Sequence, residues 1–272
     1  MNASVFWLSL IVFLPVAGAL VIACLPQARV EFLRYVALLT TAATFLVSLG
    51  ALLYPGSETH FQTNLGTMQN TFVLDWIPSF DIAYALGIDG ISLPLVILTT
   101  FISLLAMSAS WSVTKYVKAY CILFLILETA MIGFFLALDF ILFYVFWEVM
   151  LLPMYFLIGV WGGPRREYAA IKFFLYTLVG GVLMLIAILM LYFKSDLRVV
   201  AEVSDLLDKT PHPAVTWSEL HVSDAVTAQL REDPTNGGQP LHTVNILALA
   251  AMGQHTEVFS RQWQWWAVLL LF

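Results

Sequence analysis

The chain has 272 residues, of which 61% are hydrophobic and only 11% are charged. A soluble globular domain carries roughly 25% charged residues, so this composition excludes an ordinary water-soluble domain and favours a polytopic membrane protein. The net charge of −6 gives no sign of a nucleic-acid partner. Cys24 and Cys121 lie in separate apolar runs, without the spacing of a zinc site or a disulfide framework.

Six apolar stretches are long enough for transmembrane helices, because about 20 apolar residues cross the ~30 Å hydrocarbon core. No Lys or Arg precedes the first stretch, so we expect a retained helix and not an export signal. The run 263–272 is expected to be the start of a truncated seventh helix. The predicted fold class is therefore all-α, a polytopic transmembrane helix bundle with six complete spans. These spans are 4–24, 32–54, 89–111, 119–138, 140–160 and 168–193.

Two connections are long enough to have structure of their own. Phe72 to Tyr84 alternates aromatic residues with small or polar ones around Pro78, which indicates a small hairpin. Residues 194–262 contain several prolines and scattered acids without a sustained period. They are predicted to form an irregular extracytoplasmic loop with one short helix around Ser218–Leu230.

Basic residues in the short connections predict the orientation, since cytoplasmic loops carry an excess of Lys and Arg. The connection 54–88 has none. The pattern therefore places the N-terminus outside the cytoplasm and alternate short connections inside it. The basic residues of those inside connections are Arg29, Arg34, Lys115, Lys118, Arg165 and Arg166.

Two acids lie deep within predicted helices, Glu128 in the fourth and Glu148 in the fifth. An acidic side chain at the bilayer centre costs about 2.5–3.5 kcal/mol, so we interpret an acid at that depth as functional. They lie ten residues before and ten after Leu138, so a tight antiparallel hairpin would bring them to one depth. Two carboxyls in a low dielectric cannot both ionise cheaply, which suits a proton relay. The alternative for each is a structural carboxyl that hydrogen-bonds a neighbouring helix.

Lys172 is the only basic residue a full turn inside a predicted helix. Counting residues in the same way around a turn near Pro164 places Lys172 about 12 Å along the axis from Glu148. We therefore expect a water-linked path between them and not a direct salt bridge. Snorkelling to the membrane surface is the alternative. The sequence has no phosphate-binding glycine loop, haem or iron–sulfur cysteine pattern, or dinucleotide fingerprint. We therefore expect a chain that handles protons or ions and holds no cofactor or metal.

Three motifs resemble one protein family. LGIDGISLP at 86–94 resembles the LGxDGISLP signature of the antiporter-like membrane subunits of respiratory complex I. FYVFWEVMLLPMYFLIGVWGG at 143–163 is similar to the helix-five signature of chain M of that family, the counterpart of mitochondrial subunit four. YAAIKFFLYT follows and matches the start of its sixth helix. The resemblance covers residues 1–193.

The resemblance implies the N-terminal part of a proton-translocating subunit of NADH:quinone oxidoreductase in a bacterial inner membrane. Glu148 would correspond to the helix-five glutamate that gates proton movement, and Lys172 to the lysine of the KFF motif. The depth argument, and not the resemblance, adds Glu128 as a further relay partner. NADH, FMN, iron–sulfur clusters and quinone would belong to partner subunits. Other complex I membrane subunits and lipid would surround the chain.

Two alternatives stay open at this point. A subunit of a multi-subunit cation/proton antiporter or of a membrane hydrogenase would share much of this signature. A non-functional gene fragment is the other alternative, since the family's helix-seven lysine would lie beyond Phe272.

Overall fold

The computed structural model describes residues 3–53, 61, 68–77, 80–206 and 215–271. Tyr54 at the end of the second predicted span, Pro78 at the predicted hairpin tip and Phe272 lie outside the described residues. The chain forms two compact units. Unit 1 comprises Met1–Asn70, Gly87–Leu136 and Val145–Val179, and unit 2 comprises Thr71–Leu86, Ala137–Tyr144 and Gly180–Phe272.

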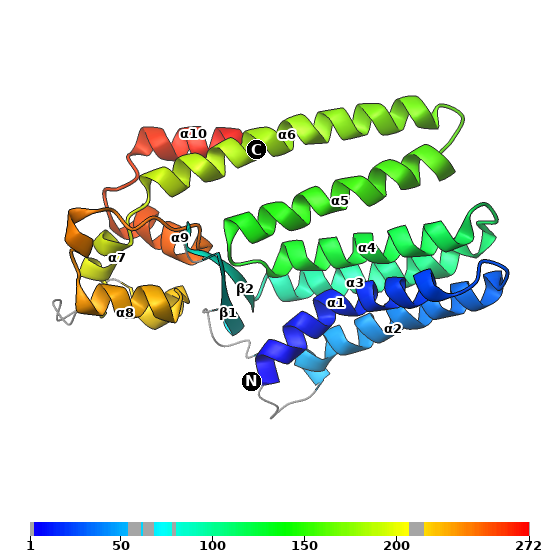
Figure 1. Cartoon of the computed structure of the whole chain (residues 1–272), viewed down its shortest axis with the longest axis horizontal. Helices are drawn as coiled ribbons and strands as arrows, with labels where there is room; N and C mark the ends of the chain where they lie inside the picture. Colours follow the sequence, from blue (N-terminus) through cyan, green and yellow to red (C-terminus); the bar gives the residue numbers. More distant parts are fainter. Residues whose placement is uncertain (1–2, 54–60, 62–67, 78–79, 207–214, 272) are drawn as a thin grey trace. The chain divides into compact units, whose positions relative to one another are not determined.

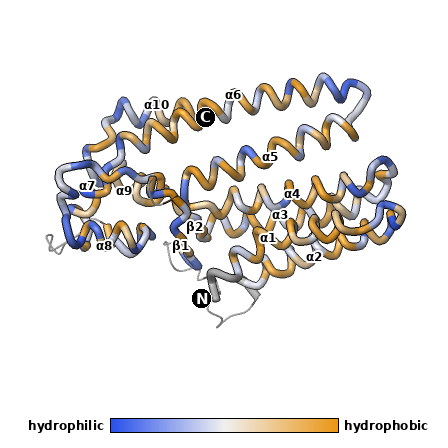
Figure 2. Tube along the Cα trace, viewed as in Figure 1, coloured by the Kyte–Doolittle hydropathy of each residue, from blue (hydrophilic) through white to orange (hydrophobic). Residues whose placement is uncertain are grey.

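In the described part of the chain, six helices are long and apolar enough to cross a membrane, which confirms the all-α fold class. Hydrophobic residues run along them and hydrophilic ones gather at their ends (Figure 2). Proline is tolerated inside two of them, at Pro15 and Pro153, as is common in membrane helices. The helices are α1 (Ala3–Cys24), α2 (Val30–Leu53), α3 (Ser92–Ala109), α4 (Val117–Leu136), α5 (Phe140–Trp161) and α6 (Arg166–Lys194) (Figure 1).

The LGIDGISLP motif sets the start of α3. The Asp89 carboxylate accepts hydrogen bonds from the backbone N–H groups of Ile91 at 3.0 Å and Ser92 at 2.6 Å. The Ser92 hydroxyl in turn accepts from the Asp89 N–H at 2.9 Å. This reciprocal arrangement satisfies donors that a helix start leaves without partners. The helix therefore begins at Ser92, three residues after the first residue of the predicted span.

Unit 1 is held together by close packing of α1 to α4. α1 and α3 each pack on α2 and α4 around a core that includes Ile22, Leu33 and Leu125. A Cβ at Gly18 would clash with Thr40, so the small residue lets α1 and α2 approach closely. Arg34 donates to the Val113 carbonyl and Lys118 to the Ala23 carbonyl. Two of the basic residues used to predict the orientation thus donate hydrogen bonds to backbone carbonyls near helix ends.

Unit 2 contains most of the predicted hairpin, with β1 at Gln69–Ile77 and β2 at Ile82–Ile88. The first two residues of β1 and the last two of β2 are assigned to unit 1. The segment expected to be irregular contains short helices instead. These are α7 (Leu197–Val203), the 3₁₀ turn η3 (Trp217–Leu220), α8 (Asp224–Glu232), the 3₁₀ turn η4 (Asn236–Gly238) and α9 (Ile246–His255). α10 (Arg261–Leu271) follows them.

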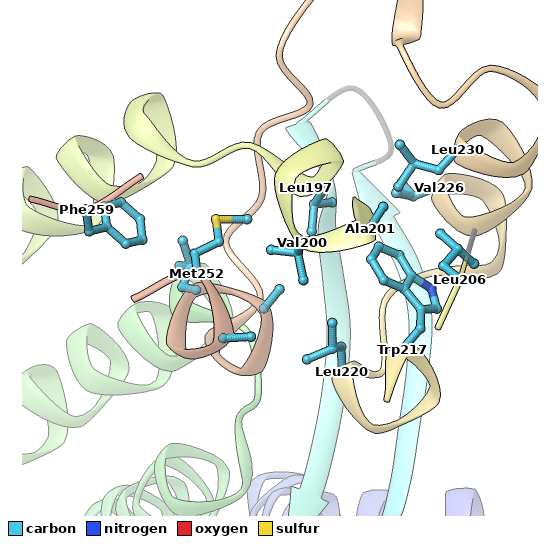
Figure 3. Packing of buried hydrophobic residues seen from close by; sticks show 13 residues of the cluster. Leu197, Val200, Ala201, Leu206, Trp217, Leu220, Val226, Leu230, Met252 and Phe259 are labelled. Carbon is cyan, nitrogen blue, oxygen red and sulfur yellow. The ribbon is translucent and has the colours of Figure 1, made fainter. Parts of the chain in front are cut away.

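A hydrophobic core explains why this segment folds. Apolar residues of α7, η3, α8 and α9 form one buried cluster, in which Trp217 lies with Leu206 and Ala201 (Figure 3). Each of the three α-helices also begins at a side-chain cap, Asp196 for α7, Ser223 for α8 and Asn245 for α9. The helix expected at Ser218–Leu230 is divided, because His221 between η3 and α8 adopts a left-handed conformation with φ of 52°.

Candidate functional site

Glu128 lies in the middle of α4 and is completely buried, with 0% of its surface exposed. Neither carboxylate oxygen has a hydrogen-bond partner among the described residues, and the neighbouring Thr129 hydroxyl has none either. Burying an ionised carboxylate without a partner is far more unfavourable than burying a neutral polar group. The position therefore suits a carboxyl group that carries a proton.

Glu148 lies on α5 and is half-buried. Its Oε1 atom is buried without a partner among the described residues, and so is the indole Nε1 of Trp147 beside it. Pro153 removes the N–H that would donate to the Val149 carbonyl, which leaves a further polar backbone group next to the acid. Buried polar atoms without partners are rare in native proteins, and bound water is one common explanation for them.

Aromatic contacts define how α4 and α5 lie against each other in unit 1. The Phe134 and Trp147 rings are 5.6 Å apart, and those of Tyr120 and Trp161 are 5.3 Å apart. A Cβ at Gly133 would clash with the Phe146 ring, so this ring of α5 packs directly on the α4 backbone at that point.

These contacts give a register that differs from the expected one. They place Glu128 at the level of Leu152, four residues beyond Glu148. Four residues correspond to about 6 Å along the axis, so the acids are about one turn apart in depth. The connection Ala137–Asp139 is an extended segment and not the tight turn expected, which displaces the start of α5. No hydrogen bond joins the two carboxylates, because Glu128 has no partner among the described residues.

Lys172 lies on α6 and is exposed. Its Nζ atom lies 5.8 Å from the centre of the Tyr168 ring, and it forms no ion pair with any residue that the structure describes. α5 and α6 meet through the Tyr155 and Phe174 rings, 5.5 Å apart. That register puts Lys172 nine residues from the level of Glu148, or about 14 Å. The structure therefore brings Lys172 to neither acid.

Two further residues of α4 and α5 have buried polar atoms without partners among the described residues and were missed by the sequence reasoning, Thr129 and Trp147. Neither carries a charge, so the cost of burying charge in a membrane did not single them out. Their position next to Glu128 and Glu148 in the chain was the available signal. The described part of the chain contains no group of His, Cys, Asp and Glu residues that could hold a metal ion.

Two family models match adjacent parts of the chain. The model of the amino terminus of NADH-ubiquinone oxidoreductase chain 4 matches residues 66–139, and the NADH:quinone oxidoreductase/Mrp antiporter transmembrane model matches residues 137–226. The second match contains Glu148 and Lys172, and the first contains Glu128.

Similar curated proteins carry related names. NADH-quinone oxidoreductase subunit M of Rhodobacter capsulatus is 48% identical over 189 residues, covering 68% of this chain and 35% of the relative. NADH-ubiquinone oxidoreductase chain 4 of Arabidopsis thaliana is 41% identical over 200 residues, covering 72% of this chain and 39% of the relative. The chain thus spans little more than a third of the length of these relatives.

Solved structures of similar fold are membrane complexes. A chain of respiratory complex I from Thermus thermophilus matches with a TM-score of 0.55 and 29% identity, covering 68% of this chain and 36% of that one. A chain of the Mrp complex from Dietzia sp. matches with a TM-score of 0.56 but only 18% identity, covering 71% of this chain and 20% of that one, which supports the shared fold alone. With its six apolar helices and these relatives, the chain is a multi-pass membrane protein that belongs to the family of antiporter-like subunits containing NADH:quinone oxidoreductase chain M and mitochondrial chain 4.

Proposed function

We propose that this chain acts in a proton-translocating membrane subunit of NADH:quinone oxidoreductase and helps to couple electron transfer from NADH to quinone with proton export. The observation that carries the proposal is the pair of acids Glu128 and Glu148, whose buried oxygens have no partners among the described residues. They lie on adjacent helices, inside segments that match the family models.

In this proposal Glu148 is the acid that takes up and releases the proton. The Glu148 side chain is half-buried, so part of its surface is accessible, whereas the Glu128 side chain is fully buried. The two carboxylates form no direct hydrogen bond with each other, and one or two water molecules can bridge an axial offset of about 6 Å. Glu128, Thr129 and Trp147 would then form the polar wall of a hydrated path.

Lys172 would serve that path from one membrane surface. At about 14 Å from the level of Glu148 it can act only through several water molecules or by biasing the charge of the path. Snorkelling to the surface explains its exposure equally well. The Lys172→Gln variant, which removes the charge, distinguishes these two roles.

The remaining parts of the proposal concern the setting of the chain. We assign the redox cofactors, namely NADH, FMN, iron–sulfur clusters and quinone, to partner subunits. We assign no redox centre to this chain. The other membrane subunits of complex I and the lipid bilayer are its neighbours. We place it in a bacterial inner membrane, with its N-terminus and the segment 194–262 on the extracytoplasmic side, from the distribution of basic residues.

Substitution of Glu148 tests the proposal. In the complete complex reconstituted into vesicles, Glu148→Gln should reduce the number of protons moved per NADH oxidised by at least about tenfold, because the amide keeps the shape but cannot exchange a proton. Glu167→Gln, at the exposed start of α6, is the matched control and should behave as the wild type. Normal pumping by Glu148→Gln would overturn the proposal.

A cation/proton antiporter subunit is the second candidate, because one of the matching family models covers Mrp antiporters as well. The 48% identity to a quinone oxidoreductase subunit, against 18% to the chain of the Mrp complex, favours the first candidate. Sodium-dependent proton movement in vesicles without NADH or quinone would support the second.

A further inference from the structure

α6 carries an open groove near its N-terminal end, in the part of the helix that belongs to unit 1. The groove has a volume of about 630 Å³. Its lining residues recur at spacings of three and four along the chain, which places them on one face of the helix. They include Arg165, Tyr168, Lys172, Phe173 and Tyr176. The groove lining therefore combines basic and aromatic side chains.

Arg165 and Lys172 are the basic residues of the groove. Arg165 immediately precedes α6, and its carbonyl accepts a hydrogen bond from the Ala169 N–H at 3.0 Å, so it belongs to the first turn. Lys172 follows about two turns later, which corresponds to about 10 Å along the axis. Both side chains are exposed, and neither forms an ion pair with a residue that the structure describes. The groove thus has two positive charges without an acidic partner in the described part of the chain.

The acid nearest to them in the sequence lies on a different face of α6. Glu167 follows Arg165 by two residues and precedes Lys172 by five. At 3.6 residues per turn it therefore lies roughly 140–160° away from both around the helix axis. No acid is present among the described residues that line the groove. The groove face consequently presents net positive charge to a ligand.

Two exposed tyrosines flank Lys172. Tyr168 is 65% exposed and Tyr176 is 83% exposed. The Lys172 Nζ atom lies 5.8 Å from the centre of the Tyr168 ring, so the ammonium group is directed towards the start of the helix. Tyrosine is enriched where a membrane meets water, and a lysine near a helix end extends its charge to that boundary. This end of the groove therefore has the composition of a site at the level of lipid headgroups.

Beyond Lys172 the exposed surface of α6 is apolar. Leu175 and Val179 are 55% and 61% exposed, and no charged residue follows Lys172 until Lys194. A phospholipid has the same order of groups, with a charged phosphate at the water boundary and acyl chains in the hydrocarbon. This face of α6 thus matches an anionic phospholipid both in charge and in polarity along its length.

We propose that the groove binds an anionic phospholipid, whose phosphate group lies between Arg165 and Lys172 and whose acyl chains follow the apolar surface of α6. The Arg165 guanidinium can donate two parallel N–H groups to phosphate oxygens, and the Lys172 ammonium adds a second positive charge. The tyrosine hydroxyls can donate to the same oxygens. Zwitterionic lipids bind less well, because the two cations repel their ammonium group. The site is more specific than general contact with the bilayer, and it does not depend on whether Glu148 moves protons.

Photolabelling of the complete complex in phosphatidylcholine vesicles tests the site. Two probe lipids carry the same photoreactive acyl chain and differ only in the headgroup, which is phosphatidylglycerol in one and phosphatidylcholine in the other. At low salt, labelling of residues 165–179 should favour the phosphatidylglycerol probe by at least about fivefold, the effect expected of one basic residue near the membrane surface. The preference should decrease at high salt, because exposed charges are then screened.

Charge variants identify the residues that produce the preference. Arg165→Gln should lower it several-fold, and Arg165→Gln combined with Lys172→Gln should reduce it to less than about twofold. Arg165→Lys combined with Lys172→Arg keeps both charges and should retain most of it. Arg29→Gln is the matched control, because it removes one exposed basic residue from the α1–α2 connection of unit 1, and it should leave the preference unchanged.

Equal labelling by the two probes in the wild type, or a preference that persists when both basic residues are replaced by glutamine, would overturn the proposal. Absence of labelling at 165–179 by either probe, with the exposed residues Leu39 and Leu46 of α2 labelled, would also overturn it, because protein would then cover the groove. If millimolar glycerol phosphate in solution abolishes the preference, the groove binds soluble phosphate esters and the assignment to a lipid is wrong.

Discussion

Glu128 in the middle of α4 and Asp139 in the α4–α5 connection are both buried acids, but the protein surrounds them differently. Asp139 accepts three hydrogen bonds from backbone N–H groups, whereas Glu128 accepts none from the described residues. A carboxylate with several donors is a fixed part of the structure, because its loss leaves those donors without partners. A carboxyl without donors adds little to stability, so its presence in a membrane helix calls for a functional explanation. Burial alone does not distinguish a structural acid from a functional one, but the count of donors does.

Removing the structural acid should have the largest effect on stability. Asp139→Ala leaves the N–H groups of Ala83, Ile141 and Leu142 without an acceptor, and we expect a loss of about 3 kcal/mol in the stability of unit 2. This loss of stability should appear as a lower midpoint temperature for the thermal dissociation of the purified complex.

Asp233→Ala is the control for that variant. Asp233 also accepts from backbone N–H groups, those of Thr235 and Gly237, but it is exposed, so water replaces the lost acceptor and the effect should be much smaller. Equal effects of the two variants would contradict the assigned structural role of Asp139.

Removing the unpartnered acid should leave stability unchanged or improve it. Glu128→Leu replaces a buried carboxyl with an apolar side chain, which we expect to stabilise the complex by up to about 2 kcal/mol while proton pumping falls several-fold. Leu125→Ala, at a fully buried position of the same helix, should destabilise the complex by about 3 kcal/mol, which shows that the assay detects lost packing in α4. A marked destabilisation by Glu128→Leu would mean that Glu128 has a structural partner.

Neutralising Lys172 should have the smallest effect on stability. Lys172 is exposed and forms no ion pair with the described residues, so Lys172→Gln should change stability by less than about 0.5 kcal/mol. Lys118→Gln is the contrast, because the Lys118 Nζ donates to two carbonyls at 2.8 Å. If Lys172 serves the proton path, pumping by Lys172→Gln will be slower with stability intact. An unchanged pumping rate would assign Lys172 to snorkelling.

The sequence predicts the long helices well because each needs an uninterrupted apolar run that nothing else in a protein requires. The same reasoning identifies Glu128 and Glu148, since a charge is conspicuous in such a run. It did not predict α7 and α9, and it gave α8 only as part of one helix around Ser218–Leu230, because short helices outside the long apolar runs lack the length that makes a pattern visible. The caps Asp196, Ser223 and Asn245 were the usable signals there.

The register of α4 and α5 was the other feature that the sequence could not supply. Counting residues from Leu138 assumes a tight turn, whereas Ala137–Asp139 is extended and paired with strands on both sides. Those partners come from β2 and from residues 244–246, more than 50 and 100 residues away. Long-range pairing of this kind leaves no local trace, so the Ala83 donor of Asp139 emerges only in the structure. The Ile141 and Leu142 donors are local, and an acid just before a helix was the available signal for them.

Infrared spectroscopy of the complex tests the central claim that the buried Glu128 carboxyl holds a proton. At neutral pH we predict an absorption band of protonated carboxyl groups that shifts in heavy water, weakens in Glu128→Gln and is unchanged in Glu167→Gln. Absence of that band from the wild type, or an identical band in Glu128→Gln, would contradict it.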